Sequence, residues 1–282
     1  MSLSVAQALA TAQALGLGRL DAQLLLGHLM QCGRAWLVAH DDHGLPAVLA
    51  SRYLADCQRR ASGEPLAYVT GEHEFHGLVL QVSPAVLVPR PDTETLVDWA
   101  LECCAAMPSG RPLDLLDLGT GSGAIALSLA SALRGRSPPA RVTATDLSPE
   151  ALAQAQANAL RLGLSVQFAL GAWWQALSSQ IRFDLIVANP PYIRESDTHL
   201  PALRHEPIMA LTSGPDGLDA LRDIVAGAPR HLNAGGRLLL EHGWDQANAV
   251  ARLLAAAGFV DVTTRLDIDG RTRCTGGHWG GD

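Results

Sequence analysis

The feature that most constrains the fold is a repeated alternation of short apolar stretches and longer helical patterns after residue 112. The apolar stretches have the length of strands, whereas the segments between them place apolar residues at helical spacing. We predict strands at 113–118, 141–145, 166–170, 183–188, 236–241, 259–266 and 271–275, and helices at 122–133, 149–162 and 245–257. This order predicts an α/β fold, a doubly wound and mostly parallel seven-stranded sheet with helices on both faces.

The chain before residue 89 has a different character. Apolar residues from position 5 to about 60 fall at helical spacing between glycines, which predicts a small bundle of short helices. We predict extended stretches at 68–71, 73–75 and 78–82, as in a β-hairpin that joins two domains. A helix should then open near 89–94, with Asp92 or Thr93 as its cap. We therefore expect an N-terminal helical domain at 1–70, a hairpin linker at 71–88 and a larger domain at 89–282.

Composition and charge exclude several functional classes. A formal net charge of -7 disfavours direct nucleic-acid binding, because phosphate contacts need clustered cations. All 21 basic residues are arginine, so the chain cannot form a lysine Schiff base. Five cysteines form no C-x-x-C pair, which indicates reduced thiols and no structural zinc site. No signal peptide and no apolar run of ~18 residues is present, so we expect a cytoplasmic protein without a membrane partner.

A glycine-rich turn follows the first predicted strand of the larger domain. Residues 115–123 read L-L-D-L-G-T-G-S-G, a buried strand that runs into the start of a helix. Glycines let the backbone approach a ligand closely, and the free N–H groups of a first helical turn favour polar or anionic groups. The next strand ends in Asp146, whose carboxylate can accept both hydroxyls of a ribose. The combination favours a nucleotide-containing cofactor over a purely structural turn or a helix cap made by Asp146.

A second motif, Asn189-Pro190-Pro191-Tyr192, ends the fourth predicted strand of this domain. Proline cannot continue a ladder, so the tip is rigid at the carboxyl edge of the sheet, where ligands bind. The Asn189 side-chain oxygen and the Pro190 carbonyl could hold the two N–H groups of a flat, weakly nucleophilic nitrogen, and Tyr192 could stack on it. A stiff turn without chemistry is the alternative for this motif.

The alternate spacing of the glycines at 119, 121 and 123 departs from the dinucleotide fingerprint. The D-x-G-x-G-x-G pattern resembles the first motif of S-adenosylmethionine-dependent methyltransferases. Over nearly its full length the chain resembles the PrmC/HemK family of protein-(glutamine-N5) methyltransferases. The stretches that carry this resemblance lie at 19–26, 63–71, 74–75, 89–94, 206–207, 210–211, 214–218, 241–243, 246 and 258–259. The segment 89–94 reads P-R-P-D-T-E, with aspartate at 92 where the family has glutamate.

The resemblance implies a Rossmann-like S-adenosylmethionine-dependent methyltransferase domain behind a helical domain that helps to bind a peptide chain release factor. The methyl group would pass from S-adenosyl-L-methionine to the side-chain N5 of the glutamine in a Gly-Gly-Gln loop of that partner, leaving S-adenosyl-L-homocysteine, without a metal. Cofactor contacts are implied for Asp117, Gly119, Thr120, Gly121, Ser122, Gly123, Asp146, Trp173 and Asn189. Asp117 and the glycine turn would face the methionine end of the cofactor. Trp173 fits the family pattern better than Trp174, which competes for the role.

Substrate contacts are implied for Asn189, Pro190, Pro191 and Tyr192, with Asn189, Pro190 and Tyr192 in the catalytic step. Arg90 and Glu94 are expected to have a structural role near the site. His242 is better explained as a satisfied histidine than as a base. Candidate contacts to the release factor, which a solvated face explains equally well, are Arg19, Arg52, Arg59 and Arg60.

Two other functions fit parts of the sequence. An adenine-N6 methyltransferase would share both motifs, but it predicts a basic face that the acidic charge balance does not favour. A binding module that has lost its chemistry would share the fold, but the intact N-P-P-Y and glycine motifs argue against it.

Overall fold

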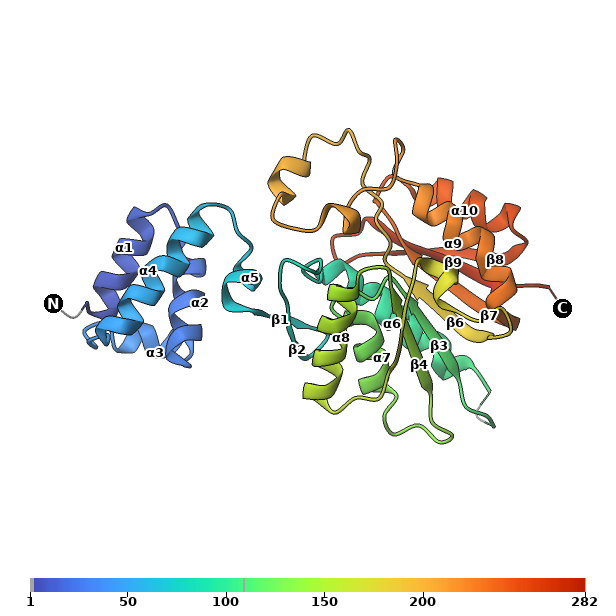
Figure 1. Ribbon diagram of the computed structural model, residues 1–282, viewed down its shortest axis with the longest axis horizontal. Coiled ribbons are helices and arrows are strands. Elements are labelled where there is room, and N and C mark those ends of the chain that lie inside the picture. The colour runs from blue at the N-terminus through green and yellow to red at the C-terminus, as the bar shows by residue number, and fades with distance from the viewer. Residues whose placement is uncertain (1–2, 109, 282) are drawn as a thin grey trace. The chain divides into compact units, whose positions relative to one another are not determined.

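The structure is a computed structural model that describes residues 3–108 and 110–281. The chain divides into two compact units, Met1–Glu72 and His73–Asp282, and each is described by itself. The first unit is helical (Figure 1), with α1 at Val5–Ala14, α2 at Arg19–Met30, α3 at Arg34–Ala39, α4 at Ala47–Ala61 and α5 at Leu66–Thr70. Its core contains the fully buried Tyr53, whose hydroxyl donates to the carbonyl of Ala22 at 3.0 Å.

Helix α5 shows that the prediction of an extended stretch at 68–71 was wrong. Pro65 occupies the N-cap position, and Gly71 ends the helix in the left-handed region at φ 80°. These two residues mark a short helix as readily as a loop, because proline is favoured at a helix start and glycine just after its end. The other two stretches are confirmed as a two-stranded hairpin, with β1 at Glu72–Phe75 and β2 at Leu78–Gln81.

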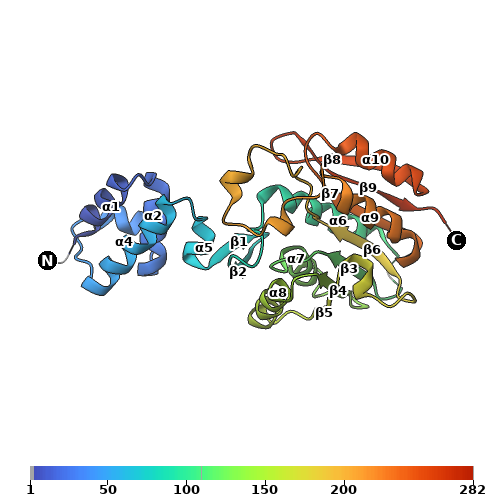
Figure 2. The same ribbon diagram turned by 45° about the horizontal axis from the view of Figure 1, so that its top comes forward.

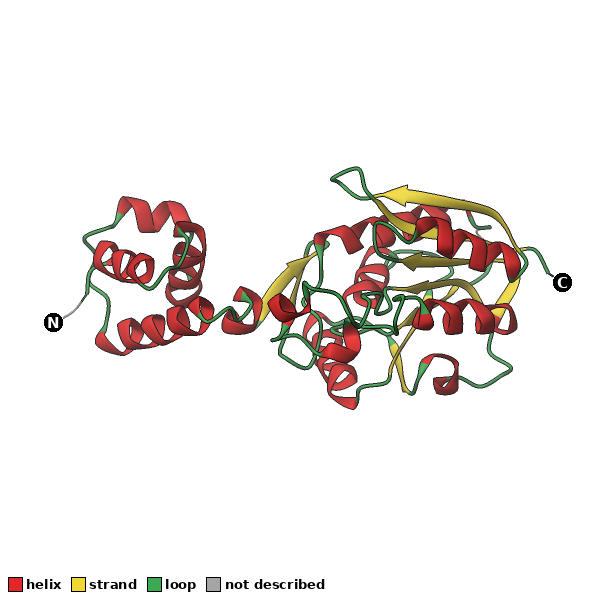
Figure 3. Cartoon of the chain, turned by 90° about the horizontal axis from the view of Figure 1, so that it is seen from above, coloured by secondary structure: helices red, strands yellow, loops and turns green. Residues whose placement is uncertain are grey.

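The second unit is built on a seven-stranded sheet with the order β5-β4-β3-β6-β7-β9-β8. Its strands are β3 at Asp114–Leu118, β4 at Arg141–Asp146, β5 at Gln167–Leu170, β6 at Phe183–Ala188, β7 at Leu232–Glu241, β8 at Phe259–Leu266 and β9 at Thr272–Trp279. The first five pair in parallel, whereas β9 is antiparallel to both of its neighbours. Figure 3 shows the strands of the unit in yellow and its helices in red. The predicted mostly parallel, seven-stranded α/β sheet is therefore confirmed.

Two strands are longer than predicted. In both, hydrogen bonding to the neighbouring strand outweighs the low strand propensity of glycine. Strand β7 begins at Leu232, opposite Phe183, four residues before Gly236, which we took for its start. Strand β9 continues past Thr275 through Gly276, where a Cβ atom would come within 2.5 Å of the Leu238 carbonyl. Glycine is required at that position by the close approach of the neighbouring strand.

Helices cover both faces of the sheet (Figure 2). The helices are α6 at Glu94–Ala106, α7 at Ala124–Ala132, α8 at Pro149–Leu162, α9 at Asp219–Gly227 and α10 at Ala247–Ala256. One core packs α6, α7 and α8 on one face, and the other packs α9 and α10 on the opposite face. Successive residues of β3 divide between them, with Leu115 in the first core and Leu116 in the second, as the period of a strand requires. No described helix combines the length and apolar character needed to cross a bilayer.

Short 3₁₀ turns lie in the connections, at Pro91–Thr93, Trp173–Ala176, Leu200–Leu203, Ile208–Ala210 and Ala228–His231. Thr93 occupies the N-cap position of α6, but the predicted side-chain cap is wrong, since neither Thr93 nor Asp92 caps the helix with its side chain. The Thr93 hydroxyl instead accepts a hydrogen bond from Asn189, at the carboxyl edge of the sheet. That edge carries the polar residues described next.

Candidate active site

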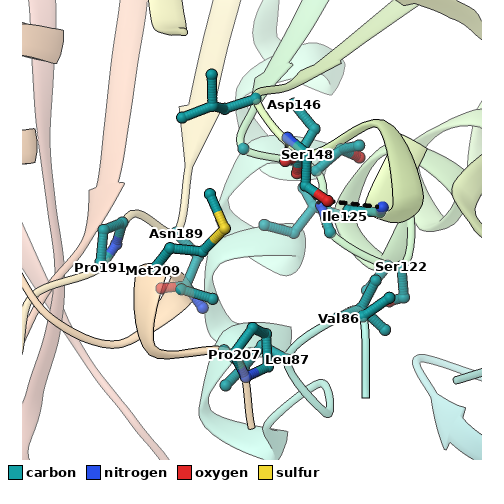
Figure 4. A pocket seen from close by; sticks show the side chains of 18 of the residues that line it. Val86, Leu87, Ser122, Ile125, Asp146, Ser148, Asn189, Pro191, Pro207 and Met209 are labelled. Atoms are coloured by element: carbon teal, nitrogen blue, oxygen red, sulfur yellow. Dashed lines mark hydrogen bonds between the residues drawn. The ribbon is translucent and has the colours of Figure 1, made fainter. Parts of the chain in front are cut away.

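A cleft opens at the carboxyl edge of the sheet, above the ends of β3, β4 and β6 (Figure 4). In this view Asp146, Ser148 and Ser122 lie on one side of the cleft, and Asn189 and Met209 lie on the other. Residues of the glycine-rich turn line it as well, namely Gly119, Thr120, Gly121 and Ser122. The cleft therefore gathers most of the residues expected to contact a cofactor, from segments that are far apart in the sequence.

The glycine-rich turn has a backbone that few other residues tolerate. Gly119, Gly121 and Gly123 all have positive φ angles, of 74°, 57° and 86°. A Cβ atom on Gly119 would lie 3.2 Å from the Trp173 ring, which also lines the cleft. Glycine is therefore needed at 119 both for the backbone angle and for the approach of the indole. Gly123 does not line the cleft, since it packs against Leu127.

Asp117 lies beneath the cleft and does not line it. Its Oδ2 accepts hydrogen bonds from the Thr120 hydroxyl at 2.7 Å and from the Ala126 N–H at 3.1 Å. These bonds tie the turn to the first residues of α7. Burial raises the pKa of the carboxyl to about 7, against the effect of both hydrogen bonds, and Oδ1 has no partner among the described residues. These bonds give Asp117 a role in shaping the turn, and its expected contact with the methionine end of the cofactor stays a prediction.

Asp146 ends β4 with both carboxylate oxygens engaged by backbone groups. Oδ2 accepts from the Gly121 N–H at 2.8 Å, and Oδ1 accepts from the Ser148 N–H at 2.9 Å. Ser148, and not Asp146, caps α8 through the Ala151 N–H. Burial raises the pKa of Asp146. Each oxygen accepts one described bond and has a second lone pair, so the carboxylate is held in a fixed orientation and can still accept ribose hydroxyls.

The two neighbouring tryptophans occupy different environments. Trp173 has a positive φ of 44° and lines the cleft beside Gly119. Trp174 packs away from it: its Nε1 donates to the Asp223 carbonyl at 3.0 Å, and its ring stacks on His231 at 4.9 Å. Of the two, Trp173 is placed where an aromatic ring could stack on an adenine.

Asn189 lies where two clefts meet. It lines the cofactor cleft with Pro191, and it also lines a second cleft together with Pro190 and Tyr192. The other residues that line the second cleft are Leu87, Arg90, Pro91, Asp92, Ile193, Leu203, Ala210 and Leu211. A group held in the second cleft would meet a ligand of the first at Asn189, as a transfer reaction between two substrates requires.

Contacts from other segments hold this tetrapeptide. The Asn189 Nδ2 donates to the Thr93 hydroxyl at 3.1 Å, which turns the amide oxygen the other way. The Tyr192 hydroxyl donates to Oε1 of Glu241 at 3.4 Å, and the Tyr192 carbonyl accepts from Nε2 of Gln246 at 3.0 Å. Burial raises the pKa of the Tyr192 phenol, so this group stays protonated and continues to donate.

Family models match two parts of the chain. Residues 4–71 match the model described as the PrmC N-terminal domain, and residues 111–264 match a methyltransferase domain. The release factor glutamine methyltransferase of Bordetella pertussis is 48% identical over 265 residues, which is 93% of this chain and 96% of the relative. That of Vibrio cholerae is 46% identical, over 92% of this chain and 89% of the relative.

The chain belongs to the release factor glutamine methyltransferase family. More distant solved structures share the fold. A methyltransferase from Pyrococcus furiosus has a TM-score of 0.53 at 20% identity, over 73% of this chain and 90% of that one. The catalytic domain of human Mettl16 with an RNA hairpin has a TM-score of 0.57 at 17% identity, over 84% and 82% of the two chains. These likenesses concern the fold alone.

Sequence reasoning did not place Thr93 or Glu241 in the site of this family member, although both support it. Both occur in stretches that carry the family resemblance, but only as parts of a motif. Thr93 was expected to cap a helix, and Glu241 was a strand end. The signal in the sequence was a polar residue at each of these positions inside a stretch that carries the family resemblance.

Glu206 is a third such residue, and it secures a loop of this methyltransferase over both clefts. It forms an ion pair with Arg90 and accepts from the Val88 N–H at 3.1 Å. The residues that follow it, Pro207 and Met209, line the cofactor cleft. Arg90 thus has the expected structural role, while Glu94 accepts separately from the His76 N–H at 2.9 Å.

Other candidates have partners that explain them without catalysis. Both ring nitrogens of the buried His242 are engaged, Nδ1 with the Gly243 carbonyl and Nε2 with Thr275, and burial lowers its pKa. Among the described residues, no group of three or more His, Cys, Asp or Glu side chains could hold a metal ion. Three of the four arginines considered for partner binding form ion pairs within the first unit, Arg52, Arg59 and Arg60.

Proposed function

We propose that this chain methylates the side-chain N5 of the glutamine in the Gly-Gly-Gln loop of a peptide chain release factor, with S-adenosyl-L-methionine as methyl donor. The observation that carries the proposal is the position of Asn189, which lines both clefts of the unit. Relatives that are nearly half identical over almost the whole chain are named release factor glutamine methyltransferases, which supports the same reaction and substrate here.

The residues that line the cofactor cleft support S-adenosylmethionine as its ligand. Asp146 would accept the ribose hydroxyls, and Trp173 would stack on the adenine. The N–H groups and side chains of the turn, from Gly119 to Gly123, would hold the polar end of the molecule, with Asp117 supporting the turn from below. The bound cofactor supplies an electrophilic methyl group on a sulfonium, which is an excellent leaving group, and becomes S-adenosyl-L-homocysteine.

The acceptor cleft would orient the glutamine amide. The Asn189 side-chain oxygen and the Pro190 carbonyl would accept its two N–H groups, and Tyr192 would cover its flat face, with Pro191 keeping the strand end rigid. These oxygens would also stabilise the positive charge that grows on the nitrogen during the reaction. Correct positioning of a weak nucleophile by this chain would contribute most of the acceleration, without a metal.

The release factor would be bound by both units of the chain, with the helical domain at 1–70 and the hairpin at 71–88 as the candidate contact regions outside the catalytic domain at 89–282. Arg19 is one candidate contact in the first unit. The acidic net charge of -7 favours a protein partner over nucleic acid. Since release factors act where translation occurs, we propose a cytoplasmic location.

Transfer of labelled methyl from S-adenosylmethionine tests the proposal. Purified release factor, its Gln-to-Ala loop variant and unmethylated DNA are offered in parallel to the wild-type enzyme, to Asn189→Ala and to Asn248→Ala. Asn248 is exposed on α10 and serves as the matched control. We expect label only on the release factor with an intact glutamine, a loss of at least about 100-fold in Asn189→Ala and none in Asn248→Ala.

Label on DNA would replace the substrate assignment by the adenine-N6 reaction and leave the cofactor assignment intact. Label on the Gln-to-Ala release factor would contradict the glutamine as acceptor. Full activity of Asn189→Ala would contradict the acceptor site.

A further inference from the structure

Glu241 is a fully buried carboxyl group next to the acceptor site, with fewer partners than its charge requires. It ends β7 with 0% of its surface exposed. Oε1 accepts the Tyr192 hydroxyl at the long distance of 3.4 Å, while Oε2 has no hydrogen-bond partner among the described residues. A buried carboxylate with an unused oxygen is costly to keep, so a structural role alone is a weak explanation for it.

Thr93 offers the complementary group. Its side chain is 3% exposed, and its oxygen already accepts the Asn189 amide N–H at 3.1 Å. The hydroxyl proton therefore needs a buried acceptor, and the Glu241 carboxyl faces it. A hydrogen bond from the Thr93 hydroxyl to the free oxygen of Glu241 would satisfy both groups.

We propose that Glu241 is a positioning residue that sets the orientation of the Asn189 side chain through the hydroxyl of Thr93. An ionised Glu241 can only accept, so Thr93 donates to it and is left to accept from Asn189. Asn189 must then direct its NH2 group at Thr93 and its oxygen at the acceptor cleft, where the substrate N–H group needs an acceptor. The inference rests on the proposed function, because the direction of these bonds matters only for a substrate that donates.

Protonation of Glu241 would reverse the chain of hydrogen bonds. A neutral Glu241 can donate to Thr93, and Thr93 can then donate to Asn189, whose amide would present its NH2 group to the NH2 group of the substrate. Burial raises the pKa of Glu241 to about 7, so this change falls in the neutral range. The titratable and charged groups that face it are Asp92, which raises the pKa, Arg273 and Tyr192, which lower it, and Cys274 on the adjoining strand β9.

The direction of the pH effect follows from this geometry. Because the active form carries an ionised Glu241, kcat should rise with pH and level off above the pKa of Glu241. Asp117 also titrates near 7, but it supports the cofactor turn and does not contact the acceptor site. Its titration should change the affinity for S-adenosylmethionine, so kcat at saturating substrates separates the two groups.

The experiment measures kcat and KM against pH with the full chain and the intact release factor for Glu241→Gln, Thr93→Val and Thr93→Ser. We expect Glu241→Gln and Thr93→Val each to lower kcat by about 10- to 100-fold and to flatten its pH profile, with little change in the KM for S-adenosylmethionine. Thr93→Ser keeps the hydroxyl and should recover most of the rate. The double variant Thr93→Val/Glu241→Gln should be no slower than the slower single variant, because both changes interrupt the same series of hydrogen bonds. Glu102→Gln, in an exposed ion pair with Arg265, is the matched control.

A second readout does not depend on turnover. Asn189 is one of four asparagines in the sequence, so its side-chain NH2 signal can be assigned after asparagine ¹⁵N labelling. The signal should titrate near neutral pH in the wild-type chain and in Thr93→Ser, and the titration should disappear in Thr93→Val. These spectra test the inference even if Glu241→Gln does not fold.

Unchanged kcat in Glu241→Gln, equal damage from Thr93→Ser and Thr93→Val, or an Asn189 signal that is insensitive to pH would each overturn the inference. Wild-type methylation of the release factor with any of these results would leave the proposed function standing. Absence of methylation by the wild-type chain would instead overturn the proposed function, and the spectra alone would then decide the inference.

Discussion

The glycine-rich turn and the acceptor tetrapeptide lie at the same edge of the sheet, yet they are supported over very different distances in the sequence. Asp117 holds its own turn through Thr120, three residues away, and Ala126, nine residues away. Asn189 is held by Thr93, 96 residues away, and the Tyr192 hydroxyl donates to a residue 49 positions away. The bonds of Asp117 that hold the glycine-rich turn are thus local, whereas the contacts that hold the acceptor tetrapeptide form only when the domain has folded.

The cofactor half, with the glycine-rich turn, and the acceptor half, with the tetrapeptide at 189–192, nevertheless share one feature. Each has a fully buried carboxyl group, Asp117 or Glu241, with one oxygen that lacks a partner among the described residues and a pKa raised by burial to about 7. Each carboxyl lies behind the residues expected to touch a substrate. Incomplete pairing of this kind lowers stability and is typical of functional sites. The comparison indicates that each buried carboxyl group lowers the stability of the fold while it orients the residues expected to touch a substrate.

The largest expected effect is on kcat in Asn189→Asp, which should change the acceptor half and leave cofactor binding by the other half nearly intact. Asn189→Asp keeps an acceptor oxygen but removes the NH2 group that binds Thr93, so we expect kcat to fall by about 100- to 1,000-fold. The affinity for S-adenosylmethionine should change by less than about tenfold, because the glycine turn is untouched. Turnover at saturating cofactor and calorimetric titration of the cofactor measure the two quantities, with Asn248→Asp as the control. A loss of affinity that accounts for the whole loss of activity would show that the halves are not separable.

A smaller effect concerns the stability contributed by the cofactor half. The pKa of Asp117 rises from 3.8 to about 7 on folding, so the folded state holds this proton more tightly than the unfolded state. The associated stability is fully present below about pH 4 and is lost as the pH rises through 7. Wild type should lose this stability between pH 4 and pH 8, whereas Asp117→Asn has no such group to titrate. The unfolding free energy of Asp117→Asn minus that of wild type should therefore increase by about 1–3 kcal/mol from pH 4 to pH 8.

Urea unfolding of both proteins across this range measures the difference, and the pH dependence common to both cancels. A difference that stays constant with pH would mean that Asp117 is ionised in the folded chain. A buried carboxyl group with a raised pKa would then be found only at Glu241.

The same contrast explains how much could be predicted from the sequence. The sheet and the residues at both strand tips followed from periodicity and from two motifs, because these signals are local. The support given by Thr93, Glu206 and Glu241 to the acceptor side depends on contacts across the domain, which no short window contains. Helix α5 was missed for a different reason, since Pro65 and Gly71 mark both loops and short helices.

The smallest expected effects come from the two neighbouring tryptophans, which sequence spacing alone could not separate. Trp173 lines the cofactor cleft, so Trp173→Phe should weaken S-adenosylmethionine binding by about three- to tenfold, with little change in unfolding free energy. Trp174→Phe loses the bond to the Asp223 carbonyl and should cost about 1 kcal/mol of stability, with cofactor affinity unchanged. Calorimetric titration and urea unfolding of both variants provide the comparison. An affinity loss in Trp174→Phe as large as that in Trp173→Phe would mean that the wall formed by Trp173 depends on the packing of Trp174, and the cofactor half would then be less local than its hydrogen bonds indicate.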